Sequence, residues 1–213
     1  PTPPLEAIEQ ILSYARHMPM PARESTNPRE YLRLHRDRAF ILTLAETGLR
    51  VSEICALRRR DVNLERRSLT VSARLELPLS PATATSIRSY LEKRAELDQK
   101  QRLVPIKDLP LFARHDKRAG KRGLPISRWT GSNIVGQWVR LALPAKVQHE
   151  LEEKNQRITP KAFRHYFVIT TLKQTGDLAI TQMLARHMDR STTRRYLRSQ
   201  QAASHLKDQE TET

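Results

Sequence analysis

One stretch of the chain has a different hydrophobic period from the rest, and this contrast points to a mainly helical fold with one small sheet. In residues 66–80, RRSLTVSARLELPLS, apolar and polar residues alternate, which is the period of a half-buried strand. The alternating apolar positions are Leu69, Val71, Leu75, Leu77 and Leu79. This pattern predicts a hairpin whose turn lies around residues 72–75. Elsewhere apolar residues recur every three or four positions, so we expect a mainly α fold with a small antiparallel β-sheet, in the α+β class.

Helix start and stop signals divide the rest of the chain into helical segments. Asn27 is placed to cap a helix that begins at Pro28, and Gly48 is placed to end it. Gly176 closes another helix before Asp177 opens the next. The ranges predicted to be helical are about 4–17, 28–48, 53–57, 82–98, 132–143, 160–175, 178–186 and 191–200. Residues 99–130 lack such a period, and we expect them to be irregular, with a basic loop at 114–123.

The length and residue usage of the chain exclude several classes of protein. Its 213 residues suffice for one domain with a hydrophobic core, and because they begin Pro-Thr-Pro-Pro we expect a piece of a longer protein. No apolar run approaches the ~20 residues that cross a bilayer, and no signal peptide is recognisable, so we expect a cytoplasmic protein without a membrane partner. Cys55 lies in an apolar pattern and is expected to be a buried structural thiol. No His, Cys, Asp or Glu cluster has metal-ligand spacing, so we expect no metal and no cofactor.

The charge of the chain favours a polyanionic partner. Lys and Arg number 38 against 23 Asp and Glu, which gives a formal charge of +15. Residues 114–200 hold 18 of the basic residues and only 6 acidic ones, so most of the excess lies in the second half. Such an excess is typical of nucleic-acid-binding proteins, and we expect double-stranded DNA as the partner. A generically basic soluble protein is the alternative.

Three short motifs carry the chemistry. They are ETGLRVSE at residues 46–53, TPKAFRHYF at 159–167 and LARHMDRSTTRRYL at 184–197. Each is weak when it is taken alone, because an arginine after a turn is usually solvated and a tyrosine on a basic helix usually packs. Their order and spacing give them meaning: His187 lies 23 residues after Arg164, and Tyr196 follows nine residues after His187.

In this order the motifs resemble the signatures of the tyrosine recombinases, the family of phage integrases and Xer recombinases. The first family motif has the form TGLR-(I/V)-S-E, which Thr47–Glu53 matches. The second has the form T-P-H-x-L-R-H, and here Lys161 stands at the histidine and Phe163 at the leucine. The third is L-G-H with a tyrosine nine residues after the histidine. The resemblance covers nearly the whole chain and implies a catalytic domain over residues 1–200, with a tail at 201–213 that is either exchanged between subunits or disordered.

The resemblance also implies a chemistry and a set of site residues. Tyr196 would attack a DNA phosphate to form a 3′-phosphotyrosyl bond, which conserves the phosphodiester energy without ATP or metal. Arg50 and Arg164 would meet the negative charge of the transition state with forked hydrogen bonds. His187 would donate a further hydrogen bond, and Glu53 is either the partner that orients Arg50 or an ordinary surface acid.

Lys161 departs from the family pattern. The usual histidine at this place is thought to help move the tyrosine proton, since a phenol has a pKa near ~10. Lysine acts as a base only if its pKa falls from ~10.4, which burial and neighbouring arginines would favour. Otherwise Lys161 is a fixed charge that holds phosphate. A cation close to the start of a helix opposes the helix dipole, a cost that a bound phosphate reverses.

A second departure lies in the hairpin, where the family places a lysine that protonates the leaving 5′-oxygen. Counting from Arg50, this place falls on Arg74, which is a poor proton donor because its pKa exceeds ~12. Either Arg74 binds DNA only, or the lysine is absent from the sequence. Lys121 and Arg122, in the basic loop, are further candidate DNA contacts.

The combined interpretation is a site-specific DNA recombinase or integrase domain that acts as a tetramer on DNA, encoded by a bacterium or phage and associated with the nucleoid. A DNA-binding regulator on the same fold that no longer cuts is the alternative, motivated by the altered positions 161 and 74. A type IB topoisomerase shares the tyrosine chemistry but not the Xer-like motifs. His165 is expected to be structural, and Tyr166, Trp129 and Trp138 are expected to lie in the core or at an interface.

Overall fold

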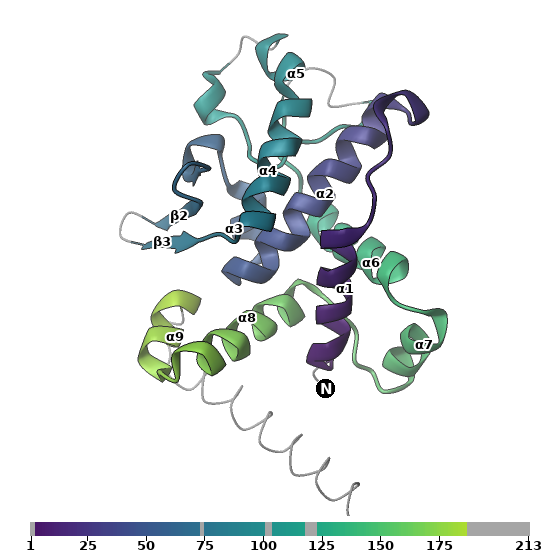
Figure 1. Cartoon of the computed structure of the whole chain (residues 1–213), viewed down its shortest axis with the longest axis vertical. Coiled ribbons are helices and arrows are strands. Elements are labelled where there is room, and N and C mark those ends of the chain that lie inside the picture. The colour runs from purple at the N-terminus through teal and green to yellow at the C-terminus, as the bar shows by residue number, and fades with distance from the viewer. Residues whose placement is uncertain (1–2, 73–74, 101–103, 118–122, 187–213) are drawn as a thin grey trace, which may run out of the picture.

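The computed structural model describes residues 3–72, 75–100, 104–117 and 123–186. This part of the chain is mainly helical and holds a three-stranded antiparallel sheet in the order β1-β2-β3. The expected fold class is therefore confirmed (Figure 1). His187 and Tyr196, together with Arg74, Lys121, Arg122 and the helix expected at 191–200, lie outside the described residues.

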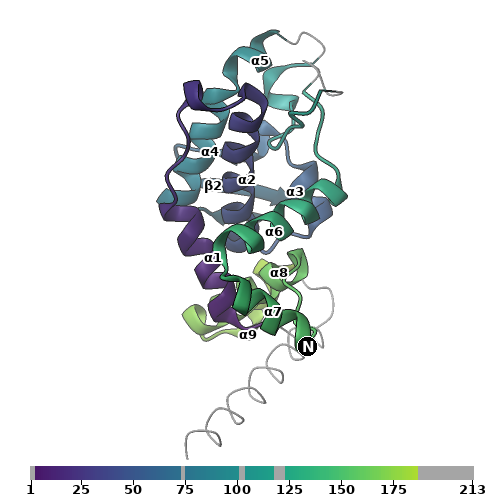
Figure 2. The ribbon, with the colours of Figure 1, turned by 90° about the vertical axis from the view of Figure 1, so that its right-hand side faces the viewer.

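The α2 helix, Pro28–Thr47, runs through the middle of the fold (Figures 1 and 2). The side chain of Asn27 accepts a hydrogen bond from the Arg29 amide at 3.0 Å, as the capping pattern predicts. Gly48 ends the helix in the left-handed conformation, with φ +54°. A Cβ added at Gly48 would lie 2.4 Å from Cδ1 of Phe167, so α8 packs directly against this turn.

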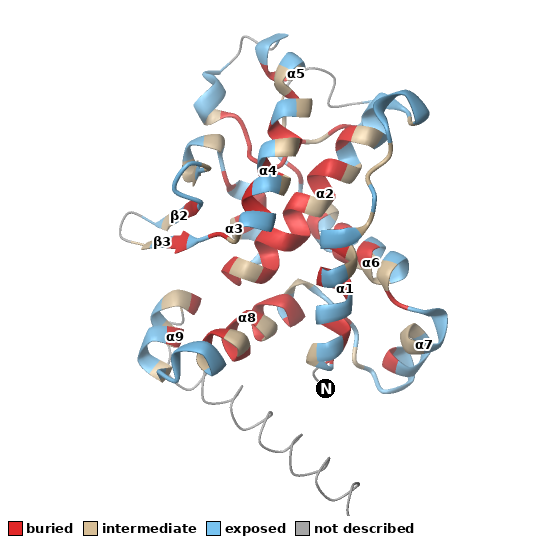
Figure 3. Ribbon diagram, in the orientation of Figure 1, coloured by how far each residue is buried: buried red, intermediate tan, exposed pale blue. Residues whose placement is uncertain are grey.

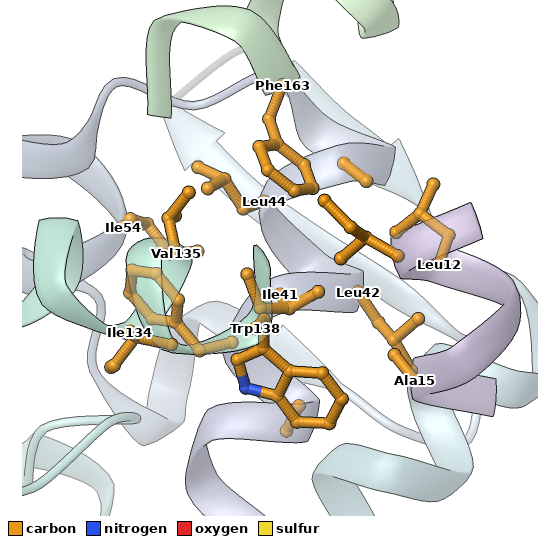
Figure 4. Close-up of a cluster of buried hydrophobic side chains, with 14 of the residues drawn as sticks. Leu12, Ala15, Ile41, Leu42, Leu44, Ile54, Ile134, Val135, Trp138 and Phe163 are labelled. Carbon is orange, nitrogen blue, oxygen red and sulfur yellow. The ribbon is translucent and has the colours of Figure 1, made fainter. Parts of the chain in front are cut away.

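A large part of the core forms where helices from the N-terminal and C-terminal halves of the chain pack on α2. These are α1 (Leu5–His17), α6 (Arg128–Ala142) and α8 (Pro160–Thr175). Trp138 on α6 is buried, and its ring meets that of Tyr14 edge to face at 6.1 Å. Figure 4 shows Trp138 beside Ile41 and Leu42 of α2. Red buried residues in Figure 3 line α2 and the facing side of α8.

The sheet contains the predicted hairpin and one additional strand. Strands β2 (Ser68–Ser72) and β3 (Leu75–Pro78) pair so that the buried residues Leu69 and Leu77 face each other. The short strand β1, Val62–Asn63, pairs with β2 and was not predicted, because two residues are too few to show a period. Helix α3, Val51–Ala56, and the 3₁₀ turn Arg59–Asp61 connect α2 to this sheet.

Two differences from the expected helices have physical causes. The helix predicted at 82–98 is divided into α4 (Pro81–Lys93) and α5 (Ala95–Lys100), because the backbone of Arg94, with φ −96° and ψ −1°, departs from regular α-helix dihedrals. The helix α7, Ala145–Glu153, was not predicted. Its apolar face is short, because it consists of the buried Leu151 and the partly buried Val147 one turn before it.

The remaining elements are two short 3₁₀ turns and the helix α9. Short 3₁₀ turns lie at Arg23–Ser25 and Ile106–Asp108. Helix α9, Leu178–Ala185, begins where Asp177 accepts from the amides of Ala179 and Ile180, which confirms the predicted cap. None of the helices in the described ranges has the length and hydropathy of a membrane span.

Candidate active site

The turn between α2 and α3 presents Arg50 at the surface. Thr47 is buried, and its hydroxyl donates to the Thr43 carbonyl oxygen at 2.7 Å, which fixes the start of the turn. Gly48 then reverses the chain, so that Arg50 becomes the residue that caps α3. The Arg50 side chain is 55% exposed. The turn therefore holds a guanidinium group in solvent on a well-anchored backbone.

Glu53 orients Arg50 through two contacts. The Arg50 amide donates to Oε2 of Glu53 at 2.7 Å, and Nη1 of Arg50 donates to Oε1 at 3.1 Å. Burial raises the pKa of the Glu53 carboxyl, but these hydrogen bonds and the charges of Arg186 and Arg50 outweigh burial and lower the pKa below its usual value. Of the two alternatives for Glu53, the contacts favour the orienting partner.

Arg164 reaches the same turn from α8, although 114 positions separate it from Arg50. Its side chain points inward and is buried. Nη1 donates to the Gly48 carbonyl oxygen at 2.6 Å, and Nη2 donates to the Ala185 carbonyl oxygen at the end of α9. The two predicted arginines are thus attached to one turn, where α2, α8 and α9 meet.

Lys161 and His165 lie on the first two turns of α8 and differ in environment. Lys161 is exposed, whereas His165 is buried. Burial, with the positive charge of Lys161, lowers the pKa of His165 to about 4, so its imidazole is neutral at pH 7. The buried neutral ring agrees with a structural role for His165.

Arg186 is a site residue that the sequence interpretation missed. Its Nη2 donates to the Gly48 carbonyl oxygen at 3.2 Å and lies 3.5 Å from Oε2 of Glu53. Its Nη1 donates to the carbonyl oxygens of Leu184 at 3.0 Å and Thr47 at 3.4 Å. A possible signal was its place in the third motif, directly before His187, where the resembled motif has glycine.

The other residues singled out from the sequence have ordinary environments. Cys55 is buried, and burial raises its pKa to about 11, so the thiol stays protonated at pH 7 as expected for a structural cysteine. Tyr166 is partly buried against the core and Trp138 is fully buried, but Trp129 is 75% exposed. Within the described ranges, no three His, Cys, Asp or Glu side chains gather as a metal site would require.

Comparison with known proteins identifies the family. The model of the phage integrase family matches residues 8–203. The chain belongs to this family. The family predicted from the order and spacing of the three sequence motifs is therefore confirmed.

Relatives within the phage integrase family include Xer recombinases. The chain is 31% identical over 179 residues to the tyrosine recombinase XerA of Pyrococcus furiosus, and the match covers 81% of the chain and 53% of that protein. It is 32% identical over 165 residues to the tyrosine recombinase XerC of Pelobacter propionicus, with 76% and 47% covered. The chain thus spans about half the length of the curated relatives it matches.

Solved structures show the same fold. A crystal structure of XerA recombinase superposes with a TM-score of 0.63 at 20% identity, and covers 92% of the chain and 57% of that protein. The XerH site-specific recombinase, bound to its palindromic difH substrate in a post-cleavage complex, gives a TM-score of 0.64 at 19% identity, with 97% and 54% covered. The phage integrase fold therefore extends through the described helices and sheet.

Proposed function

We propose that this chain is the catalytic part of a site-specific recombinase that cuts and rejoins double-stranded DNA through a 3′-phosphotyrosyl intermediate. Tyr196 is the nucleophile, and Arg50, Arg164 and His187 stabilise the transition state. The chemistry needs neither metal nor ATP, since the phosphotyrosyl bond keeps the energy of the broken phosphodiester.

The observation that carries this proposal is the contact of Arg164 with Gly48. Through it a buried arginine of α8 is fixed to the turn that holds the exposed Arg50. Guanidinium groups match the oxygens of a phosphate and keep their charge at any working pH. The pentacoordinate transition state carries more negative charge on its non-bridging oxygens than the ground state does, so pre-positioned cations lower the barrier.

Lys161 acts in this proposal as a fixed positive charge that holds phosphate. Its side chain is exposed at the start of α8, so the burial on which a role as general base depends does not occur in the free protein. The N-terminus of a 16-residue helix adds its own dipole at the same place. The side chain of Thr159, the residue that caps α8, makes no capping hydrogen bond there.

The remaining parts of the proposal concern the assembled protein. Residues 1–200 form the catalytic domain and 201–213 are a tail that passes to a neighbouring subunit, within a tetramer that exchanges strands between two duplexes. Arg74, Lys121 and Arg122 contact the DNA backbone, which agrees with the charge of +15. The protein acts where its DNA lies, in the cytoplasm of a bacterial cell.

A suicide substrate tests the reaction. A duplex nicked just beyond the scissile phosphate loses a short fragment after cleavage, so the protein stays covalently attached to DNA. Because the target sequence is unknown, the substrates are nicked duplexes made from the junctions of the element that encodes the protein. The wild-type chain is expected to form an adduct that survives detergent, whereas Tyr196→Phe forms none. An adduct of equal yield in Tyr196→Phe would refute the assignment of the nucleophile.

A second candidate function is that of a DNA-binding regulator that does not cut. The exposed Lys161 in place of a histidine favours it, because that side chain lacks the burial expected of a proton carrier. Such a protein would shift the duplex in a gel and leave it intact. Binding in both cases weakens with salt, so only the covalent adduct separates the two functions.

A further inference from the structure

Arg186 has an unusual backbone conformation for its residue type. It caps α9 with φ +54° and ψ +42°, in the left-handed region. Among the described residues, the other non-glycine residues with a positive φ are Arg67 and Asn155. A side chain with a Cβ is disfavoured there relative to glycine. An arginine at this place therefore needs side-chain contacts that compensate.

The contacts of Arg186 lead almost entirely to the turn that holds Arg50. Apart from the Leu184 carbonyl oxygen, its acceptors are the carbonyl oxygens of Thr47 and Gly48, and it forms an ion pair with the carboxylate of Glu53. The side chain is only 16% exposed. Its guanidinium group thus lies between the end of α9 and the start of α3.

Arg186 shares an acceptor with each of the two proposed catalytic arginines. The Gly48 carbonyl oxygen accepts from both Arg164 and Arg186, at 2.6 and 3.2 Å. The carboxylate of Glu53 accepts from Arg50 at 3.1 Å through one oxygen and lies 3.5 Å from Arg186 through the other. A shift of Arg186 would therefore disturb both partners at once.

We propose that Arg186 is a positioning residue of the recombinase site, which clamps the Thr47–Glu53 segment to the end of α9 and so fixes Arg50 relative to Arg164. This proposal rests on the proposed function for the reaction that it serves. The clamp also anchors the chain at the point where the sequence continues to His187. Its charge adds to that of Arg50 and Arg164, and so strengthens the preference of the site for an anion.

The electrostatics agree with a strained but paired position. Burial lowers the pKa of Arg186, the carboxylate of Glu53 raises it and the charge of Arg50 lowers it further. Nε of Arg186 is buried and has no hydrogen-bond partner among the described residues. A buried Nε without a partner and a left-handed backbone both cost stability, and such a cost is expected where a side chain serves a functional site rather than the stability of its helix.

Two substitutions and a matched control test the clamp. Arg186→Gly removes the side chain and leaves a residue for which the left-handed backbone conformation is not strained. Arg186→Lys keeps the positive charge but loses the several N–H donors of the guanidinium group. Arg67→Gly makes the same change at the same kind of backbone position, φ +51°, on an exposed turn for which no side-chain hydrogen bond is seen. Each folded variant is compared by the rate of adduct formation at saturating nicked DNA, and by hydrogen exchange of the amides of Arg50 and Ile54.

The clamp predicts that Arg186→Gly forms the adduct roughly 10- to 100-fold more slowly, because displaced catalytic groups lose rate steeply with distance. Arg186→Lys should recover part of this loss, and Arg67→Gly should stay within about twofold of the wild type. Hydrogen exchange at Arg50 and Ile54 should become faster in Arg186→Gly but not in Arg67→Gly, since these amides bond within the clamped segment.

The outcomes separate this proposal from the proposed function. Unchanged exchange in Arg186→Gly overturns the clamp, whatever the rate does, and an unchanged rate with faster exchange overturns its role in the reaction. If the wild type forms no adduct on any junction, the proposed function fails. Exchange alone then decides the clamp: faster exchange in Arg186→Gly but not in Arg67→Gly supports it.

Discussion

Two arginine-rich regions of this molecule use the same side chain in opposite ways. One, the polar core network, joins α2, α4, α5 and the segment after residue 109, and consists of Arg36, Asp37, Tyr90, Arg94, Asp98 and His115. The other, the arginine turn, consists of Arg50, Glu53, Arg164 and Arg186. The first is enclosed in the fold, whereas the second presents Arg50 to solvent.

In the polar core network each guanidinium group has a carboxylate close by. Arg36 pairs with Asp37 at 2.7 Å, and Arg94 pairs with Asp98 at 2.9 Å. Arg94 also donates to the Leu111 carbonyl oxygen at 2.9 Å, which ties down a segment without regular structure. Buried charges that are paired and hydrogen-bonded hold such a segment in one conformation.

In the arginine turn, Arg50 and Arg186 share the single carboxylate of Glu53, and backbone carbonyl oxygens accept from Arg164 and Arg186. Carbonyl oxygens orient a guanidinium group without cancelling its charge. The acceptor, more than the arginine itself, therefore distinguishes a structural position from one suited to bind an anion.

Acid should produce the largest loss of unfolding free energy, through His115 of the polar core network and through two buried histidines outside it, His35 and His165. Burial lowers the pKa of His35 and His165 to about 4 and that of His115 to about 3. The unfolded chain, with histidine pKa values near 6.5, then binds more protons than the folded one. The contribution of these neutral histidines to the free energy of unfolding is therefore fully present above pH 6.5. It falls as the pH drops toward 4, by up to about 1.4 kcal/mol per pH unit for each histidine.

Urea unfolding between pH 7 and 4 measures this slope. The Tyr90 hydroxyl accepts from Arg94 and from the Ala113 amide, so its own proton is donated to a neutral His115. Because His115→Gln removes this titrating group, it should reduce the pH dependence of the unfolding free energy by up to one proton. A slope equal to that of the wild type would show that His115 is not buried in its neutral form.

Removal of one carboxylate in each region should give the next largest effect. Asp98→Asn leaves Arg94, which is 1% exposed, without its charge partner, and should cost about 3–5 kcal/mol of unfolding free energy. Glu53→Gln makes the matched change in the half-buried arginine turn and should cost no more than about 1 kcal/mol. Equal losses in urea unfolding at pH 7 would remove the distinction between the two regions.

The third predicted effect concerns the reaction and lies, in free energy, just below that of Asp98→Asn. Arg164→Lys keeps a charge but loses the fork, and should slow adduct formation on nicked DNA by about 10²- to 10³-fold. Arg36→Lys is the control from the polar core network, and its folded fraction should react at a rate close to that of the wild type. If both variants lose rate equally, the arginine turn has no special part in the chemistry.

The sequence predicted those features that depend on local signals. Asn27, Gly48, Gly176 and Asp177 each bound a helix as their residue types indicate. The division at Arg94 was not predictable, because it accompanies contacts with distant parts of the chain: Arg94 donates to the Leu111 carbonyl oxygen, and Asp98 accepts from Arg59. Local propensity gives way to such long-range contacts.

The site was predictable only in part for a similar reason. The motifs led to Arg50 and Arg164, and the structure attaches both to one turn. Arg186 was not predicted because the contacts that place it at the site, with the carbonyl oxygens of Gly48 and Thr47, span 138 and 139 residues of the chain. The roles of these residues in catalysis stay predictions, as do those of Lys161, His187 and Tyr196.

The two tryptophans give the molecule a pair of separate optical reporters. Trp138 is enclosed against Tyr14, so its fluorescence should be blue-shifted and shielded from iodide. Trp129, at the beginning of α6 and open to solvent, should emit at longer wavelength and be quenched freely. A Trp129→Phe protein would thus report unfolding alone, and the difference from the wild-type spectrum would report whatever approaches the first turn of α6.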